Sequence, residues 1–300
     1  MNAAYREKAM SYGQTTPLTG VLTLPVTPAP SSQPVIVFLN AGLIHHVGPN
    51  RLHVTLARAL AGSGYTSCRF DLAGIGDSPH RGDGQPIPEG VAADIRATLD
   101  HLESSLGARR FVLFGLCAGA DNALASAATD PRVDGCVLLD PSIHRTRAWY
   151  GHYYAGRATR LDSWKSVLTG RHPAWRRLTD RALRAVRPEP NFAACDDLPS
   201  PEAEPEFFRS GPITPDAIGA RWRAALARGA RFFVVFTLDW GIFYSYADQL
   251  YDCYPDIDFG RTALHHRPET RHTFTTESDR NWLVESVIQW LRTSPAQDAR

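Results

Sequence analysis

Short apolar runs alternate with longer segments of helical periodicity through most of the chain. The central runs are apolar enough to be buried on both faces of a sheet, and the segments between them repeat apolar residues every three or four positions. Predicted strands are residues 18–26, 35–42, 66–72, 111–115, 135–140 and 231–239, with a weaker one at 258–264. Predicted helices are residues 51–65, 90–107, 118–128, 217–230 and 279–291, with a short one at 246–254. This alternation predicts an α/β fold with a doubly wound, mostly parallel sheet.

The alternation breaks between residues 144 and 210. That segment is rich in Trp, Tyr, Arg and Pro and has no pattern of a buried strand. We therefore predict one core built from residues 1–143 and 211–300, interrupted by an inserted helical cap at residues 144–210.

A cysteine lies where one predicted strand meets the next helix. Cys117 is flanked by Gly115 and Gly119, each two residues away. Small residues at these places allow the sharp strand-to-helix turn on which hydrolases present a nucleophile. A helix N-terminus and a nearby histidine also lower the pKa of a thiol, which favours the reactive thiolate. The alternative is a buried structural cysteine in a tight turn.

A thiolate mechanism needs a base and an orienting acid. Among eleven histidines, His272 stands in a polar loop just before the last helix. Asp239 ends a buried strand, where open α/β sheets carry functional groups. Cys117, Asp239 and His272 follow the order nucleophile, acid, histidine. Asp140, which ends the strand 135–140, is the rival acid.

The chain resembles the α/β-hydrolase fold superfamily across nearly its whole length. Three segments carry the resemblance: FDLAGIGDS at 70–78, the elbow GLCAG at 115–119 with Cys in place of the usual Ser, and RHTFT at 271–275. More narrowly, the segment 115–170 resembles the type 1 hydrolases associated with exosortase systems, which also carry Cys at the elbow. The resemblance implies an oxyanion hole formed by the amide of Ala118 and by one from the Gly42 and Leu43 region.

Several other side chains are candidates for substrate contact. His45 and His46 follow the strand 35–42, although they can equally line or cap their loop. Trp149, Tyr153 and Trp240 can wall an acyl or aromatic pocket, although cap aromatics also serve as packing. Asp71 and Asp77 are interpreted as structural turn residues.

Composition excludes several classes of function. The formal net charge is +1, which gives no reason to expect nucleic acid or an anionic membrane as partner. The five cysteines show no CxxC pair and no metal-ligand spacing, which favours reduced thiols and a cytoplasmic protein. No signal peptide or membrane span is visible, and GxGxxG is absent. We expect no metal and no cofactor.

The chemistry predicted from these residues is acyl transfer through an acyl-cysteine. Cysteine exchanges one thioester for another at little cost, so thioester donors are favoured, with release to water or to an alcohol or amine. The segment between residues 145 and 187 contains ten Arg and one Lys but only two Asp. This excess suits coenzyme A phosphates or an acidic carrier protein, unless these arginines face solvent or pair with the acidic run at 196–206. A non-catalytic binding or scaffolding protein is the alternative, and the oligomeric state is left open.

Overall fold

Eight strands form a single sheet in the computed structural model, which describes residues 5–13, 16–27, 30, 32–158 and 208–293. The strand order is β1-β2-β4-β3-β5-β6-β7-β8. The strands are β1 Tyr5–Tyr12, β2 Leu18–Pro25, β3 Val35–Phe38, β4 Ser67–Phe70, β5 Phe111–Leu116, β6 Val133–Leu139, β7 Arg231–Thr237 and β8 Thr262–Arg267. Strands β1 and β2 run antiparallel to their neighbours, and the pairs from β4 onward are parallel.

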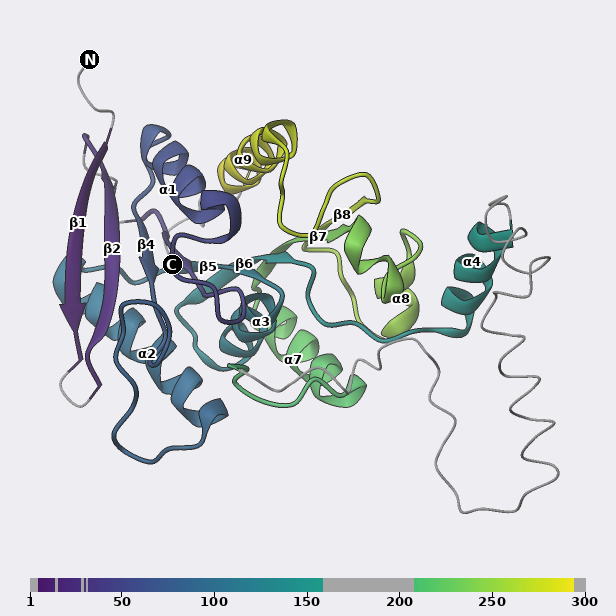
Figure 1. Ribbon diagram of the computed structural model, residues 1–300, viewed down its shortest axis with the longest axis horizontal. Coiled ribbons are helices and arrows are strands. Elements are labelled where there is room, and N and C mark those ends of the chain that lie inside the picture. Colours follow the sequence, from purple (N-terminus) through teal and green to yellow (C-terminus); the bar gives the residue numbers. More distant parts are fainter. Residues whose placement is uncertain (1–4, 14–15, 28–29, 31, 159–207, 294–300) are drawn as a thin grey trace, which may run out of the picture.

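Helices cover both faces of this sheet, with α1 and α9 on one face and α2, α3 and α7 on the other (Figure 1). The described α-helices are α1 Leu52–Gly62, α2 Ile87–Leu106, α3 Ala118–Thr129, α4 Arg147–Ala158, α7 Pro215–Ala227, α8 Gln249–Cys253 and α9 Glu277–Arg292. Short 3-10 turns occupy Pro49–Arg51 and Leu238–Ile242. Of the described helices, none is long and apolar enough to cross a membrane.

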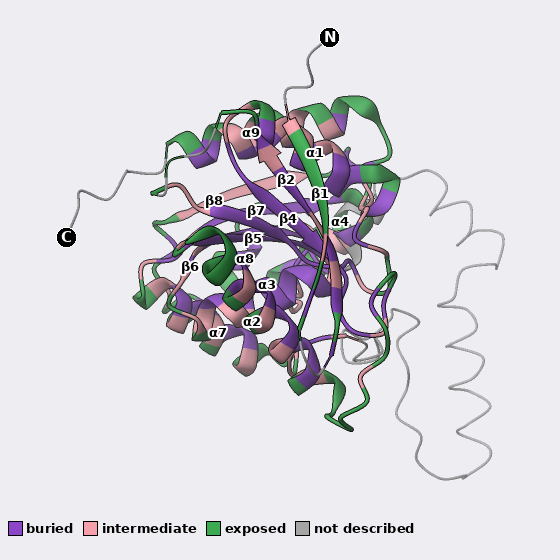
Figure 2. Cartoon of the chain, turned by 90° about the vertical axis from the view of Figure 1, so that its left-hand side faces the viewer, coloured by how far each residue is buried: buried purple, intermediate pink, exposed green. Residues whose placement is uncertain are grey.

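The two layers of helices explain why the central strands are continuously apolar. Along β7, Phe232, Val234 and Phe236 pack into the cluster shared with α2, α3 and α7. Phe233 and Val235 point to the opposite face, into the cluster shared with α1 and α9. Figure 2 shows the central strands buried between the helices, whereas β1 is largely exposed. Successive side chains of a strand alternate between faces, so both sets must be apolar.

The parallel strands place their carboxyl ends at one edge of the sheet. Cys117 directly follows β5, Asp140 directly follows β6, and Asp239 and His272 follow β7 and β8. Because β5, β6, β7 and β8 are consecutive neighbours, these four residues come together although they span more than half of the chain.

The predicted α/β-hydrolase fold with its mostly parallel sheet is confirmed. The prediction missed β1, whose side chains are mostly exposed and polar and which pairs only with β2. An edge strand of this kind carries no buried apolar pattern. The last strand also begins later than predicted, at Thr262. Of the predicted cap, residues 159–207 lie outside the described residues, so the division into core and cap stays a prediction.

Candidate active site

The turn after β5 holds Cys117 in a strained backbone conformation, with φ 56° and ψ −121°. A Cβ on Gly115 would overlap the backbone of Gly119 and Ala120, and a Cβ on Gly119 would lie 2.6 Å from the carbonyl oxygen of Asn40. Strand, helix α3 and the loop after β3 can approach this closely only with glycine at both places. The predicted elbow geometry is therefore present, and the side chain of Cys117 is only partly buried.

The other described cysteines have a different environment. Cys68 and Cys136 are completely buried in the core, and burial raises the pKa of Cys68 to about 12 and that of Cys136 further. Burial also raises the pKa of Cys253 to about 12. All four described cysteines are free. These three thiols are therefore held protonated at neutral pH, which leaves Cys117 as the described thiol suited to nucleophilic attack.

The imidazole of His272 connects Cys117 to a carboxylate. Its Nδ1 lies 2.6 Å from Asp140 Oδ2, and Cys117 lies close enough to raise the pKa of the ring. An ionised carboxylate can only accept, so Nδ1 carries the hydrogen and Nε2 is left for the thiol. Burial, the largest influence, lowers the pKa of His272, but Asp140 and Cys117 together raise it to about 10.

Asp140 is a fully buried carboxylate held on three sides. Its Oδ1 accepts from the Thr237 backbone amide at 2.7 Å, and its Oδ2 accepts from the Thr237 hydroxyl at 2.6 Å as well as from His272. Thr237 is the last residue of β7, so neighbouring strands fix the acid in place. The role of Thr237 was not predicted, because a threonine at the end of a strand carries no distinctive signal in the sequence.

The carboxylate that contacts the imidazole is therefore Asp140 and not Asp239, our first choice from the sequence. Asp239 accepts from the backbone amide of His272 at 2.9 Å and from Arg271 at 3.0 Å, and it is exposed. The 3-10 turn Leu238–Ile242 carries it past the end of β7. Both carboxylates reach the same edge of the sheet, and only the path of this turn decides which one faces the ring.

Trp240 packs against the imidazole. Its ring is stacked on that of His272 at a centroid distance of 5.0 Å and an interplanar angle of 9°. Its Nε1 donates to the carbonyl oxygen of Pro141 at 3.2 Å, next to Asp140 in the chain. The electron-rich face of indole favours a cation, so Trp240 supports the charged imidazole, and its predicted role as a wall of the substrate pocket stays a prediction.

The two predicted parts of the oxyanion hole approach each other. Ala118 is the first residue of α3, so its amide has no acceptor within the helix. The loop after β3 packs on the start of α3 through Asn40 and Gly119, and it carries Gly42 at φ 56°. Leu43 follows it and is 66% exposed. The oxyanion hole itself stays a prediction.

Three aromatic side chains at the start of the predicted cap, Trp149, Tyr150 and Tyr153, pack on one another. Trp149 is fully buried and is stacked on Tyr153 at a centroid distance of 4.5 Å. The guanidinium of Arg145 lies over Trp149, 4.8 Å from its centroid. Trp149 therefore serves in packing, the alternative to a wall of the substrate pocket. Trp164 and Trp175 lie outside the described residues.

A buried ion pair that the sequence did not predict connects helix α3 to the last residues of the predicted cap. Asp121 on α3 accepts from Arg209 Nε at 2.8 Å, and both side chains are 5% exposed. Asp121 also accepts from the amide and the hydroxyl of Ser142, two residues after Asp140. The next helix residue, Asn122, bonds the backbone of Phe208 and Ser210. Residues so distant in the chain give no sequence signal of this contact.

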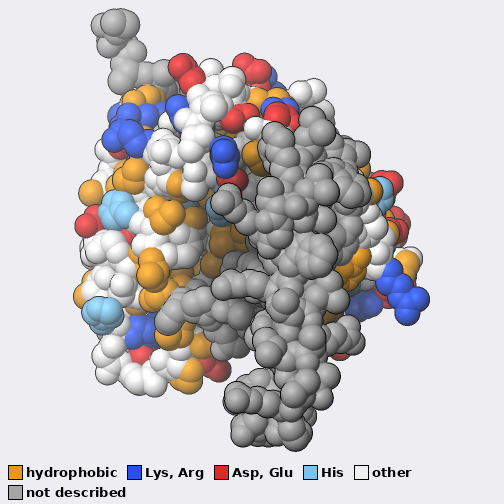
Figure 3. Space-filling view, turned by 45° about the vertical axis from the view of Figure 1, so that its right-hand side comes forward, with side chains coloured by type: hydrophobic (Ala, Val, Ile, Leu, Met, Phe, Trp, Pro, Cys, Tyr) orange, Lys and Arg blue, Asp and Glu red, His pale blue; other side chains and the backbone are white. Residues whose placement is uncertain are grey.

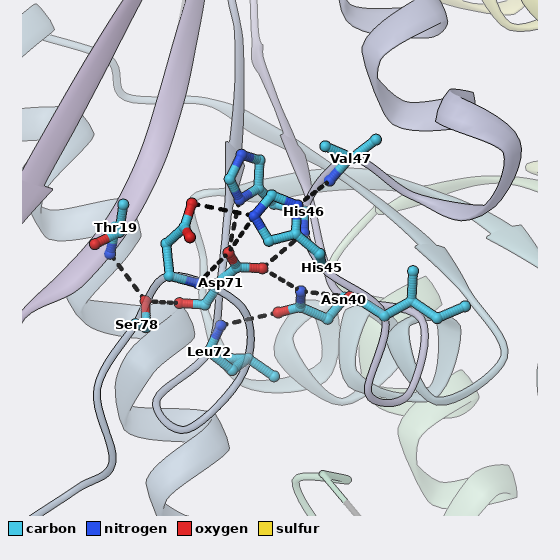
Figure 4. A network of polar contacts seen from close by, with 10 residues as sticks. Thr19, Asn40, His45, His46, Val47, Asp71, Leu72 and Ser78 are labelled. Atoms are coloured by element: carbon cyan, nitrogen blue, oxygen red, sulfur yellow. Dashed lines mark hydrogen bonds and ion pairs between the residues drawn. The ribbon is translucent and has the colours of Figure 1, made fainter.

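His45 and His46 bond two aspartates at the same edge of the sheet. His46 Nδ1 lies 2.6 Å from Asp71, and His45 Nε2 lies 3.1 Å from Asp77 (Figure 4). These are the described residues that could hold a metal ion. Figure 3 shows both acidic and basic side chains on the described surface, in keeping with the net charge of +1.

The sheet order and the nucleophile elbow together define an enzyme of the α/β-hydrolase class. A family model described as "Serine aminopeptidase, S33" matches residues 32–209, and the chain belongs to this hydrolase family. No curated protein matches the sequence.

Solved structures agree with this class at the level of the fold. An esterase from Pyrococcus furiosus is 13% identical with a TM-score of 0.58, covering 97% of this chain and 91% of its own. Proline iminopeptidase from Mycobacterium smegmatis is 17% identical with a TM-score of 0.56, covering 95% and 98%. An α/β serine hydrolase homologue from Coxiella burnetii is 14% identical with a TM-score of 0.54, covering 95% and 96%.

Proposed function

We propose that this protein is an acyl-transfer enzyme that forms a covalent acyl-cysteine on Cys117. His272 acts as the general base and Asp140 as the acid that orients it and stabilises its charged form. The observation that carries this proposal is the hydrogen bond of 2.6 Å between Asp140 and His272 beside Cys117, which stands on the strained turn between β5 and α3. The resemblance to exosortase-associated hydrolases is compatible with it, because those proteins also carry Cys at the elbow.

The reaction proceeds in two steps. The proton of the thiol rests on His272 Nε2, as the raised pKa of the ring favours, when sulfur attacks the acyl carbonyl carbon, and the amides of Ala118 and of the Gly42 and Leu43 region stabilise the oxyanion. The donor leaves as a thiol, taking the proton from His272, and the acyl group stays on Cys117. His272 then deprotonates water, an alcohol or an amine, which attacks the acyl-cysteine and releases it.

Thioesters are the donors that this nucleophile favours. Attack by a thiolate on a thioester conserves the energy of the acyl bond, whereas attack on an alkyl ester or an amide leads to a more reactive species. The matching family is described by a serine nucleophile and aminopeptidase activity, so esters and aminoacyl amides belong in the test as competing substrates.

The donor we favour carries a negatively charged handle, such as acyl-coenzyme A or an acyl carrier protein. The support is the excess of arginine over acidic residues between residues 145 and 187, of which Arg145 and Arg147 lie among the described residues and most of the others outside them. A nucleophilic thiol must also stay reduced, which favours the cytoplasm.

Intact-mass spectrometry after incubation with acyl-coenzyme A and carrier-linked thioesters tests the proposal. We expect an acyl adduct on wild-type protein and none on Cys117→Ala. Cys253→Ala is the matched control, since it removes a thiol that burial keeps protonated, and it retains the adduct. Wild-type protein that forms no adduct with any thioester, ester or amide, or an adduct that survives in Cys117→Ala, would contradict the proposal and favour the non-catalytic alternative.

Single-turnover release of the acyl-enzyme separates hydrolysis from transfer. The acyl-enzyme is isolated and its decay is followed in water alone and with added alcohols or amines. Decay in water as fast as with any acceptor identifies a thioesterase, and acceleration by an acceptor identifies an acyltransferase.

A further inference from the structure

Two loops bring four metal-ligating side chains together at the edge of the sheet. His45 and His46 follow β3, and Asp71 and Asp77 follow β4. One ligand atom from each residue lies within 4.8 Å of all the others. Figure 4 shows the imidazoles of His45 and His46 beside the carboxylate of Asp71. Catalysis by Cys117 uses none of these side chains.

Asp71 is oriented as a ligand by groups other than the histidines' rings. Its Oδ1 accepts from Asn40 Nδ2 at 2.8 Å and from the backbone amide of His46 at 2.7 Å. With Oδ1 occupied in this way, Oδ2 is turned toward the imidazoles, 2.6 Å from His46 Nδ1 and 3.4 Å from His45 Nε2. Carboxylate ligands of protein metal sites are commonly fixed by outer hydrogen bonds of this kind.

The spacing of the ligand atoms suits a small tetrahedral ion. Around a zinc ion with bonds of about 2.0–2.2 Å, neighbouring ligand atoms lie about 3.3 Å apart. The three nitrogen-to-oxygen distances that link His45 to Asp71, His46 to Asp71 and His45 to Asp77 are 3.4, 2.6 and 3.1 Å. The two distances from His45 lie near the tetrahedral value, and an ion would move the buried atoms His46 Nδ1 and Asp71 Oδ2 apart by about 0.7 Å.

The cluster is packed against Gly76 and is open to solvent on its other side. Gly76, at φ 52°, lies against it, and a Cβ there would overlap Asp71 Oδ2 and lie 2.6 Å from His45 Cδ2. Asp71 and His46 are buried, with 0% and 5% of their side chains exposed, whereas His45 and Asp77 are 36% and 61% exposed. An ion can therefore enter past the two outer ligands and bind the two inner ones.

We propose that His45 Nε2, His46 Nδ1, Asp71 Oδ2 and Asp77 Oδ2 bind one zinc ion. Two imidazoles and two carboxylates in four-coordinate geometry suit Zn²⁺ better than the larger oxygen shells of Mg²⁺ or Ca²⁺. On binding, zinc takes the place of the hydrogens that the imidazoles share with the carboxylates, and these protons are released. The ion ties the loop after β3, which carries Gly42 and Leu43, to the loop after β4. Our expectation of no metal from the sequence is revised accordingly.

Zinc titration of the chelator-treated full chain tests this site, with competition by a chromophoric chelator to measure affinity. The measurement is made on wild-type protein and on Cys117→Ala, since a thiol and an imidazole could bind zinc by themselves. We expect one equivalent in both proteins, and intense visible absorption from four-coordinate cobalt(II) when cobalt replaces zinc. The site is independent of the proposed function, because it does not involve Cys117.

Two ligand variants and one control complete the experiment. His45→Ala and Asp77→Ala remove exposed ligands with little risk to folding, and each weakens zinc binding by more than about 100-fold, since loss of a merely orienting residue already costs about 10- to 100-fold. His80→Ala, which removes an exposed histidine of the neighbouring loop, leaves affinity unchanged. The proposal is overturned if wild-type protein binds no more zinc than His45→Ala, or if His80→Ala weakens binding equally.

Discussion

Replacing Asp140 or Asp239 by asparagine distinguishes the two carboxylates that contact His272. In Asp140→Asn, the amide oxygen can still accept from the Thr237 backbone amide, and the amide nitrogen can donate to the Thr237 hydroxyl. That same nitrogen then faces His272 Nδ1, which must become an acceptor. The hydrogen of the neutral ring then moves to Nε2, and a protonated Nε2 can no longer accept the proton of the thiol.

The magnitude follows from the pKa of His272. Its rise from 6.5 to about 10 corresponds to about 5 kcal/mol in favour of the imidazolium, at about 1.4 kcal/mol for each pKa unit. Loss of the carboxylate charge in a triad of this type costs about 10,000-fold in kcat, which is about 5.5 kcal/mol. We therefore expect kcat/KM of Asp140→Asn to fall by about 1,000- to 10,000-fold.

Asp239→Asn is the matched control for this change. Asp239 is exposed and accepts from the backbone amide of His272, so an amide oxygen can keep that bond, and we expect less than a tenfold loss. Rates are measured with the thioester that gives the adduct, and iodoacetamide alkylation of Cys117 gives a second measure that needs no substrate. Equal losses in the two variants, or an Asp140→Asn enzyme of nearly normal activity, would refute the assignment. Circular dichroism checks that both variants are folded.

Three further predictions concern pH, the elbow and the buried ion pair. Because the pKa of His272 is raised on folding, its contribution to stability is complete below pH 6.5 and is lost as the pH rises through about 10. The free energy of unfolding of wild-type protein, relative to His272→Asn, therefore falls by about 3 kcal/mol between pH 7 and pH 9.5 in urea melts, and a constant difference would disprove the pairing. Gly115→Ala destabilises the protein by at least about 1–3 kcal/mol, because its Cβ overlaps the backbone of α3. Gly62→Ala is the control, because a Cβ there meets nothing within 4 Å, and we expect thermal melts to show it to be neutral or stabilising. Equal effects of the two substitutions would contradict the close approach at Gly115. Arg209→Met leaves the buried Asp121 without this cation and lowers stability by about 3–5 kcal/mol in urea melts, and a loss below about 1 kcal/mol would count against a buried pair.

The amino-acid sequence by itself determined the layered fold and the sharp turn that carries Cys117. Both depend on local patterns: apolar runs that suit strands buried on both faces, amphipathic segments that suit helices, and the two glycines that permit the turn at Cys117. The structure confirms the elements from Leu18 to Arg292 that the pattern predicted, with small shifts at their ends. The edge strand β1 had no such pattern, because its exposed side chains have no core to face.

Tertiary structure alone decided which side chains meet. The strands β6 and β7 each end near an aspartate. The 3-10 turn after β7 directs Asp239 to the backbone amide of His272, so that Asp140 is the carboxylate that contacts the imidazole. The cluster of His45 with Asp71 depends in the same way on β3 and β4 being neighbours in the sheet. Such pairings join residues far apart in the chain, and a difference of a few ångströms in a loop selects between them. Local hydrophobic pattern carries no information on that choice, because it specifies faces and not partners.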